Sequence, residues 1–191
     1  MRILIIGGSG FLSGTMARQA LRDGHEVWVV TRGQRPLPEG VHGLQADRHD
    51  TAALAAAVRQ PGQQFDLVVD CIAYRVADIE QDLALLPDLA RHFVFISTDF
   101  VFDPAHRLFP QPAENQRFLR NDTYGAHKRR CEEKLLTTDC GAMTWTTLRA
   151  CHIYGPGSQL GCLPCHGRDP ELLARLGRGE TLRLVGGGHY L

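Results

Sequence analysis

The sequence has no excess of either charge and no long apolar run. Its 191 residues carry 21 Lys and Arg against 21 Asp and Glu, so it lacks the broad basic field expected of a non-specific nucleic-acid binder. No apolar run approaches the roughly 18 residues that cross a bilayer. The N-terminal run, residues 3–6, stops at Gly7 and is shorter than a signal-peptide core of roughly 7–15 residues. We therefore expect a cytoplasmic protein that binds neither nucleic acid nor membrane.

The six cysteines give no pattern typical of a metal site or a disulfide framework. A cytosolic chain of this size does not need disulfides. Cys162 and Cys165, followed by His166, spell a c-type haem attachment motif, but that attachment requires export. A zinc ion needs further ligands, and the sequence has no second Cys-x-x-Cys. We predict no metal and interpret this segment as a loop that contains two thiols.

Apolar, β-rich runs alternate with longer helical stretches, without an internal repeat or a low-complexity tract. Short strands of this kind, separated by helices, indicate a parallel sheet covered on both faces. Right-handed crossovers make such an α/β sheet doubly wound, as in the Rossmann fold. The predicted strands are residues 3–6, 27–30, 44–46, 67–70, 93–97, 144–148 and 182–185, and the predicted helices are residues 11–22, 51–59, 76–86, 123–136 and 170–176.

A glycine-rich turn follows the first predicted strand. Gly7, Gly10 and Ser13 recur at a three-residue spacing, and Gly14 is displaced by one position. Glycines there permit a tight turn and let backbone N–H groups approach a pyrophosphate at the N-terminus of the next helix. Ser13 replaces the last glycine of the pattern and is small enough to permit close helix packing. The dinucleotide contacts predicted from this turn are Gly7, Ser9, Gly10, Phe11 and Leu12.

The end of the second predicted strand indicates which dinucleotide binds. An acidic side chain there would hold the adenosine ribose 2′-hydroxyl of NAD. Thr31 and Arg32 follow the strand instead, so Arg32 is placed to meet the 2′-phosphate of NADP, with Arg35 as a second cation. We predict NADP as the cofactor and keep NAD as the alternative. The structural alternative is that Arg32 is only a solvated loop residue.

A tyrosine and a lysine open the helix predicted over residues 123–136. Tyr124 and Lys128 are spaced i and i+4 and so share one face of that helix. We expect the ammonium to lower the pKa of the phenol, so that Tyr124 exchanges protons near neutrality, and Lys128 can also hold the nicotinamide ribose. Thr98, at the carboxyl end of the fifth predicted strand, can donate a hydrogen bond to a substrate oxygen. These three are the predicted catalytic residues of a hydride-transfer site.

These motifs resemble those of the extended short-chain dehydrogenase/reductases, in particular the NAD-dependent epimerase/dehydratase family. The resemblance covers essentially the whole chain, and residues 148–149 and 153–157 match that family's loop beside the nicotinamide and the substrate. Residues 73–78 and 97–103 look most like dTDP-4-dehydrorhamnose reductases. The further cofactor contacts that the resemblance implies are Asp47, Arg48, Ala73, Tyr74, Ser97, Tyr124 and Lys128.

The resemblance implies an NAD(P)-dependent epimerase or reductase that acts on a nucleotide sugar. The family's sugar 4,6-dehydratases carry an Asp-Glu pair after the threonine, but here Asp99 is followed by Phe100. The base needed for that elimination is absent, so dehydration is not expected. The alternative is a non-catalytic dinucleotide-binding regulator or interaction protein on the same fold. The intact set of Thr98, Tyr124 and Lys128 favours the enzyme.

Members of the resembled family are longer than this chain. We therefore expect a dinucleotide-binding domain over residues 1–157 and only the start of a substrate-binding region over residues 158–191. No helix is predicted to cover Leu182, Leu184 and Val185, and exposed apolar surface of this kind is commonly buried by self-association. The expectations are an incomplete substrate domain, little turnover by the chain alone and a homodimer.

Overall fold

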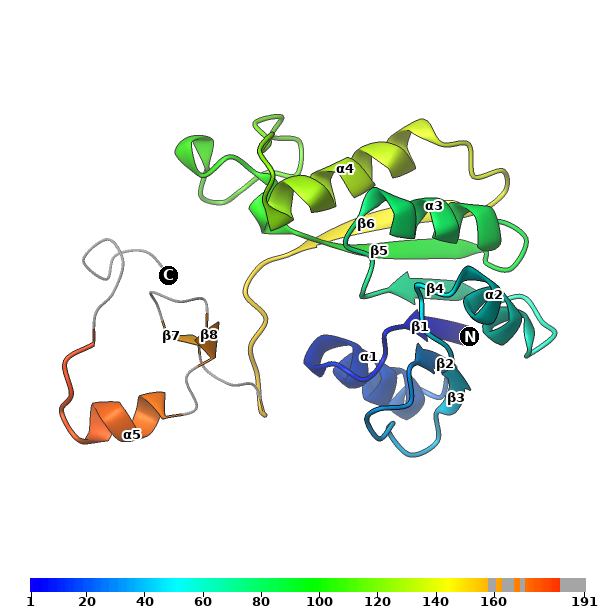
Figure 1. Ribbon diagram of the computed structural model, residues 1–191, viewed down its shortest axis with the longest axis horizontal. Coiled ribbons are helices and arrows are strands. Elements are labelled where there is room, and N and C mark those ends of the chain that lie inside the picture. The colour runs from blue at the N-terminus through cyan, green and yellow to red at the C-terminus, as the bar shows by residue number, and fades with distance from the viewer. Residues whose placement is uncertain (158–160, 163–166, 169–170, 183–191) are drawn as a thin grey trace. The chain divides into compact units, whose positions relative to one another are not determined.

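A computed structural model describes residues 1–157, 161–162, 167–168 and 171–182. The chain forms two compact units, Met1–Cys151 and His152–Leu191. The first unit is built on a six-stranded parallel sheet with the strand order β3-β2-β1-β4-β5-β6 (Figure 1). This confirms the predicted α/β class with a doubly wound parallel sheet.

The helices and strands lie close to their predicted positions. The strands of the sheet are β1 (Arg2–Ile6), β2 (Glu26–Thr31), β3 (His42–Gln45), β4 (Leu67–Asp70), β5 (His92–Thr98) and β6 (Thr144–Ala150). The helices of the same unit are α1 (Phe11–Arg22), α2 (Thr51–Arg59), α3 (Val76–Leu85) and α4 (Tyr124–Thr137), with two 3₁₀ turns, η1 (Asp99–Val101) and η2 (Pro104–His106).

The second unit contains a short antiparallel pair, β7 (Gly161–Cys162) with β8 (Gly167–Arg168), and the helix α5 (Leu172–Gly177). Residues 183–185 of the last predicted strand lie outside the described residues, and Leu182 belongs to no strand. Cys165 and His166 also lie outside them. The predictions about a final strand and about a loop with two thiols therefore stay predictions.

The two faces of the sheet are covered unequally. Successive side chains of a strand point to opposite faces, and Leu4 and Ile6 pack in one cluster with residues of α2, α3 and α4. Ile3 and Ile5 pack on the other face with Ala17 of α1. Figure 1 shows α3 and α4 side by side over one end of the sheet. The connection between β2 and β3 is a loop, so α1 is the one helix of the first unit that covers the face carrying Ile3 and Ile5.

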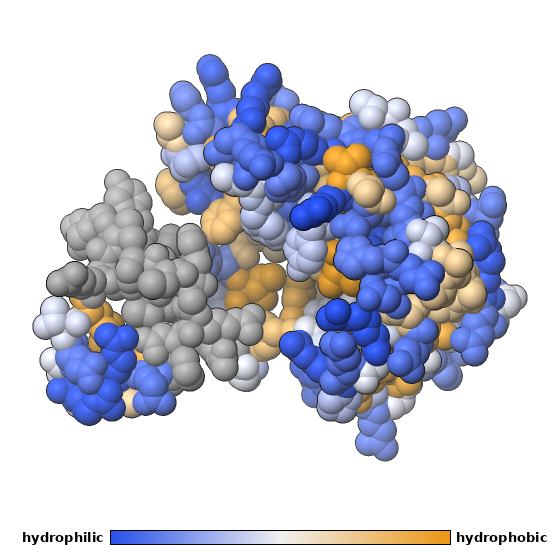
Figure 2. Space-filling view, viewed as in Figure 1, coloured by the Kyte–Doolittle hydropathy of each residue, from blue (hydrophilic) through white to orange (hydrophobic). Residues whose placement is uncertain are grey.

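Two features are absent from the described residues. No helix among them is long and apolar enough to cross a bilayer. No group of three or more His, Cys, Asp or Glu side chains among them could hold a metal ion. In the view of Figure 2, the surface is mainly hydrophilic and broken by small apolar areas.

Candidate functional site

A cavity of about 360 Å³ lies at the carboxyl ends of the strands in the first unit. Loops that follow β1, β2, β3 and β4 form its wall, and this is the edge at which open α/β sheets bind ligands. The predicted cofactor contacts found in the wall are Gly7, Ser9, Gly10, Arg32, Asp47, Arg48 and Tyr74. Phe11 and Leu12 lie at the start of α1, while Ala73 and Ser97 are buried.

The glycine loop is closed by the hydroxyl of Ser13. Its Oγ donates to the Gly7 carbonyl at 2.8 Å and accepts from the Gly10 N–H at 3.0 Å. Gly7 has a φ of +88°, and a Cβ on Gly8 would lie 2.2 Å from the side chain of Val29, so the loop runs directly against β2. The result is a preformed cradle at the start of the 12-residue helix α1, which fits the phosphates of a dinucleotide.

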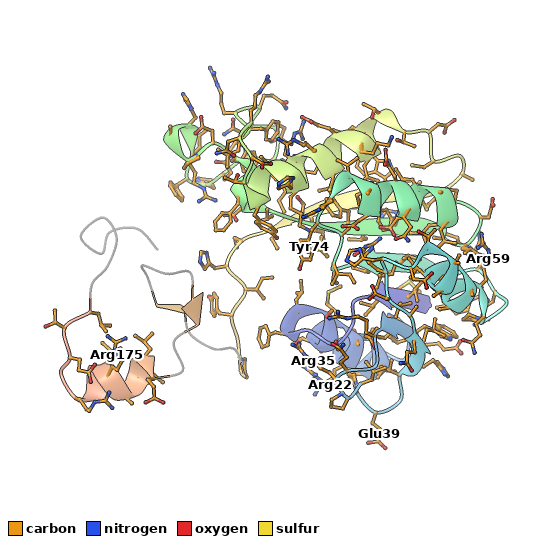
Figure 3. All side chains as sticks on the ribbon, viewed as in Figure 1. Arg22, Arg35, Glu39, Arg59, Tyr74 and Arg175 are labelled. Atoms are coloured by element: carbon orange, nitrogen blue, oxygen red, sulfur yellow. The ribbon has the colours of Figure 1, made fainter. Side chains whose placement is uncertain are left out.

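The far end of the cavity carries positive charge and one carboxylate. Arg32 and Arg35 are exposed on the loop after β2, and both line the cavity; Arg35 is labelled in Figure 3. Asp47 follows β3, where its carboxylate accepts a hydrogen bond from the His49 N–H at 2.9 Å. The arrangement offers guanidinium groups to a phosphate and a fixed carboxylate to an amino group.

Thr98 and Tyr124 lie next to each other because α4 begins against the turn that follows β5. Thr98 is buried and accepts a hydrogen bond from the Phe100 N–H at 3.3 Å. A Cβ on Gly125 would lie 1.9 Å from the Phe100 carbonyl oxygen, so glycine permits this close approach. Tyr124 stays 47% exposed, with its ring centroid 6.1 Å from that of Tyr74.

The Lys128 ammonium is buried and held by the backbone. Its Nζ donates to the carbonyl oxygens of Ala73 at 2.7 Å and Ile96 at 2.6 Å. It also lies 4.8 Å from the Tyr74 ring centroid and 4.6 Å from that of Phe95, within the range of cation–π contacts. Burial lowers the pKa of Lys128, although Asp70 partly offsets this. An ammonium has three N–H donors, and the two carbonyls fix its position.

The pKa of Tyr124 differs from the expectation. Burial raises it first, and Tyr74 and Asp99 raise it further, while a hydrogen bond with Thr98 lowers it in part. The prediction that this pKa is lowered is wrong for the protein by itself, because burial and the neighbouring Tyr74 and Asp99 raise it. Tyr124 is therefore protonated near neutrality and suited to donate a proton.

Two groups of buried charges were missed from the sequence. One is an aspartate cluster in which Asp70, Asp78 and Asp82 surround the guanidinium of Arg48. A signal for it exists, because Asp70 ends an apolar strand and the other two aspartates are spaced i and i+4 on α3. Arg48 was expected to contact the cofactor; it reaches the cavity wall, but its guanidinium is buried in this cluster.

The other missed group is centred on Glu132, one helical turn after Lys128 on α4. Its buried carboxylate accepts from the Ser97 hydroxyl at 2.7 Å and pairs with Arg129 and Arg149, both at 2.9 Å. Ser97, which was expected to contact the cofactor, thus has its hydroxyl bound to Glu132. The group ties the ends of β5 and β6 to α4, next to Thr98.

A parallel sheet of this order with a glycine cradle at the first strand-to-helix turn defines a dinucleotide-binding protein of the Rossmann class. The chain belongs to the NAD dependent epimerase/dehydratase family, whose family model matches residues 3–190. This confirms the family that the motifs resemble.

The individual proteins that this chain resembles match it at low sequence identity. The chain is 27% identical over 170 residues to the chloroplast stem-loop binding protein of 41 kDa b of Arabidopsis thaliana, which covers 81% of this chain and 43% of that protein. It is 27% identical over 203 aligned positions to 2-alkyl-3-oxoalkanoate reductase of Stenotrophomonas maltophilia, covering 98% of this chain and 59% of that protein. The chain thus spans about half the length of these two relatives.

Solved structures show the same fold. The Bordetella bronchiseptica enzyme WbmG, in complex with NAD and UDP, superposes with a TM-score of 0.72 at 22% sequence identity. The match covers 95% of this chain and 61% of the WbmG chain. At this identity the likeness establishes the fold and leaves the chemistry to the residues of the site.

Proposed function

We propose that this chain binds NADP and belongs to an enzyme that transfers a hydride at a carbon of a nucleotide sugar, as a reductase or an epimerase. The observation that carries the proposal is the place of Tyr74, which links the cofactor cavity to the catalytic candidates. It lines the cavity, lies 4.8 Å from the Lys128 ammonium, and its ring centroid is 6.1 Å from that of Tyr124. The NAD and UDP bound by WbmG support the ligand class.

Each residue of the proposed site has a role that follows from its chemistry. When bound, a nicotinamide dinucleotide supplies or accepts the hydride. The backbone N–H groups of the glycine loop hold its phosphates, and Lys128 holds the nicotinamide ribose. Tyr124 exchanges a proton with the reacting oxygen of the substrate, and the Thr98 hydroxyl orients the same oxygen. The raised pKa of Tyr124 supports the direction in which a ketone is reduced, because that direction needs the protonated phenol.

The preference for NADP rests on the end of β2. Thr31 and the exposed Arg32 stand where an NAD-binding protein places an acidic side chain. Arg35 lines the same part of the cavity. Two guanidinium groups favour a 2′-phosphate, because guanidinium–phosphate hydrogen bonds are charge-assisted.

The substrate region and the oligomeric state belong to the same proposal. Residues 158–191 belong to a substrate-binding region that is separate from the dinucleotide-binding domain of residues 1–157. Self-association into a homodimer would cover exposed apolar side chains of the described residues, among them Leu148, Leu173 and Leu176. The relatives of greater length support this division of the chain.

A second candidate is a dinucleotide-binding protein without catalytic activity. The match to a stem-loop binding protein of Arabidopsis thaliana favours it. Such a protein needs the glycine loop and the cavity to bind the dinucleotide, but it does not require proton transfer by Tyr124. The two candidates therefore differ in what a change at Tyr124 does.

Two substitutions test the proposal. We expect Tyr124→Phe to lower turnover of UDP-linked and dTDP-linked 4-keto sugars by about 10²–10⁴-fold, the usual contribution of a general acid, while the Kd for NADPH stays within about twofold. Lys128→Ala should impair both, because this residue also contacts the cofactor. NADPH oxidation measured by absorbance gives turnover, and calorimetry gives the Kd.

The outcomes separate the candidates. Near-normal turnover by Tyr124→Phe would contradict the proton-transfer role. Tight NADPH binding by the parent protein without turnover of any sugar in the panel would favour the non-catalytic candidate. A parent protein that binds no dinucleotide would overturn both.

A further inference from the structure

The aspartate cluster behind the cavity has no part in the reaction proposed above. Arg48 is 4% exposed, and Asp70 and Asp82 are fully buried. The Arg48 guanidinium donates to the Asp70 carboxylate, to Asp82 Oδ1 at 2.6 Å and to the Asp78 carbonyl oxygen at 3.0 Å. One side chain therefore joins the loop after β3 to the end of β4 and to α3.

Two aspartates of the cluster hold the loop after β4. Asp70 Oδ1 accepts hydrogen bonds from the N–H groups of residues 72 and 73 at 2.6 and 2.8 Å. Asp78 Oδ2 accepts from those of residues 74 and 75 at 2.8 and 3.0 Å. Four consecutive N–H groups thus depend on two carboxylates, and both carboxylates face the guanidinium of Arg48.

The same loop fixes the Lys128 ammonium. The Ala73 carbonyl accepts from Lys128 Nζ at 2.7 Å, and the Tyr74 ring covers this ammonium at 4.8 Å. A continuous path of hydrogen bonds therefore runs from Arg48 through Asp70 and the backbone of Ala73 to Lys128. A shift of the loop moves both the ring and the carbonyl that position the ammonium.

The cluster also explains why Arg48 is a poor direct ligand. Its side chain is 2% exposed, and its charge already faces three carboxylates. Burial and the neighbouring Asp70 raise the pKa of Asp82 well above its ordinary value. Arg32, in contrast, is exposed at the cavity and free to approach a phosphate.

We infer that Arg48 is a positioning residue for Lys128 and Tyr74, and that it determines affinity for the nicotinamide half of the dinucleotide and not for the adenosine half. This inference rests on the proposed function. The competing interpretation is that Arg48, next to Asp47 in the cavity wall, contacts the adenosine half directly.

The test compares a whole dinucleotide with its adenosine fragment. Calorimetry on the full chain gives the Kd of NADPH and that of adenosine 2′,5′-bisphosphate, which lacks the nicotinamide ribose; NADH and 5′-AMP are the matching pair for an NAD site. We expect Arg48→Lys to weaken NADPH by about tenfold or more, the loss typical of a hydrogen bond to a charged group. The fragment should change by less than about twofold, because the adenosine end is untouched.

Three further variants sharpen the comparison. Arg32→Ala is the matched control, and it should weaken both ligands alike because it contacts the part they share. Lys128→Met should reproduce the selective loss of Arg48→Lys. The double variant should bind NADPH no more weakly than Lys128→Met alone, because the two residues act through one contact.

Asp78→Asn provides an independent variant if Arg48→Lys does not fold. It keeps the guanidinium, replaces the charged acceptor for residues 74–75 with a neutral amide, and should again weaken NADPH selectively. Equal weakening of both ligands by Arg48→Lys, or unchanged NADPH affinity in folded variants, would overturn the inference and leave the proposed function standing. A parent protein that binds neither ligand overturns both.

Discussion

Arg32, which directly follows β2, is the residue on which the proposed preference for NADP depends. We predict that the parent protein binds NADPH more tightly than NADH, and that Arg32→Ala weakens NADPH by about tenfold while NADH is little changed. The reason is that a guanidinium–phosphate pair contributes about 1.5–3 kcal/mol and only NADP carries the 2′-phosphate. Fluorescence titration of both cofactors measures the two constants.

The control for that prediction is Arg59→Ala. Arg59 lies in the last turn of α2 and outside the cavity wall (Figure 3), so its loss removes one positive charge without touching the site. Equal loss of NADPH affinity in both variants would indicate a general charge effect. Tighter binding of NADH by the parent protein would contradict the prediction directly.

At the scale of helices, alanine substitutions at two glycines that both lie in helices should have opposite effects on the free energy of unfolding. Gly125 lies in the first turn of α4, and a Cβ there would meet the Phe100 carbonyl oxygen at 1.9 Å. Gly14 lies in α1, where the nearest atom to a Cβ is the end of the Arg18 side chain at 3.5 Å. The two positions therefore separate steric cost from helix propensity.

We predict that Gly125→Ala lowers the free energy of unfolding by about 1–3 kcal/mol, the usual cost of overpacking, because backbone cannot move aside as a side chain can. Gly14→Ala should leave it unchanged or raise it by up to about 1 kcal/mol, since alanine favours helix over glycine. Urea denaturation followed by circular dichroism measures both. Similar values for the two variants would show that α4 does not start against Phe100.

The contact between the end of β4 and α3 should make stability depend on pH. Burial and Asp70 raise the pKa of Asp82 in the folded protein, so the folded state retains a proton that the unfolded chain releases. The stability from this group is fully present below the unfolded pKa of about 3.9, and it is lost as the pH rises through the folded value.

Asp82→Asn should remove the loss of stability that ionisation of Asp82 causes at higher pH. The amide cannot ionise, yet it still offers an oxygen to Arg48 and an N–H to Asp70. The variant should gain stability relative to the parent as the pH rises from acid toward the folded pKa. Urea midpoints at a series of pH values test this, and a difference between the two proteins that is independent of pH would contradict it.

At the scale of the whole molecule, the two faces of the sheet in the first unit are covered unequally. The cavity and the three catalytic candidates all lie within Met1–Cys151, and within this unit one face of the sheet carries a single helix. We predict a homodimer with twice the 21.2 kDa mass of the chain, since Leu148, in register with Ile96 on that face, is 49% exposed and exposed apolar surface favours association. Sedimentation velocity at micromolar concentration measures the mass. A single 21.2 kDa species would contradict the prediction.

The local patterns of the sequence determined the class of fold and the glycine turn at which the cofactor is proposed to bind. Alternating apolar runs and helices specify a parallel sheet because each crossover is short and has one hand. The turn of Gly7, Gly10 and Ser13 is local in the same sense, since its hydrogen bonds join residues within six positions of each other. Such features need only neighbouring residues, so the sequence displays them directly.

Only the tertiary structure decided the state of the charged groups. Arg48 pairs with Asp70 and Asp82, 22 and 34 positions away, and Lys128 is held by the carbonyl of Ala73, 55 positions away. The pKa of Tyr124 is raised because the phenol is partly buried and lies near Tyr74 and Asp99. Burial and electrostatic interactions act through space, so these properties depend on which strands and loops the fold brings together.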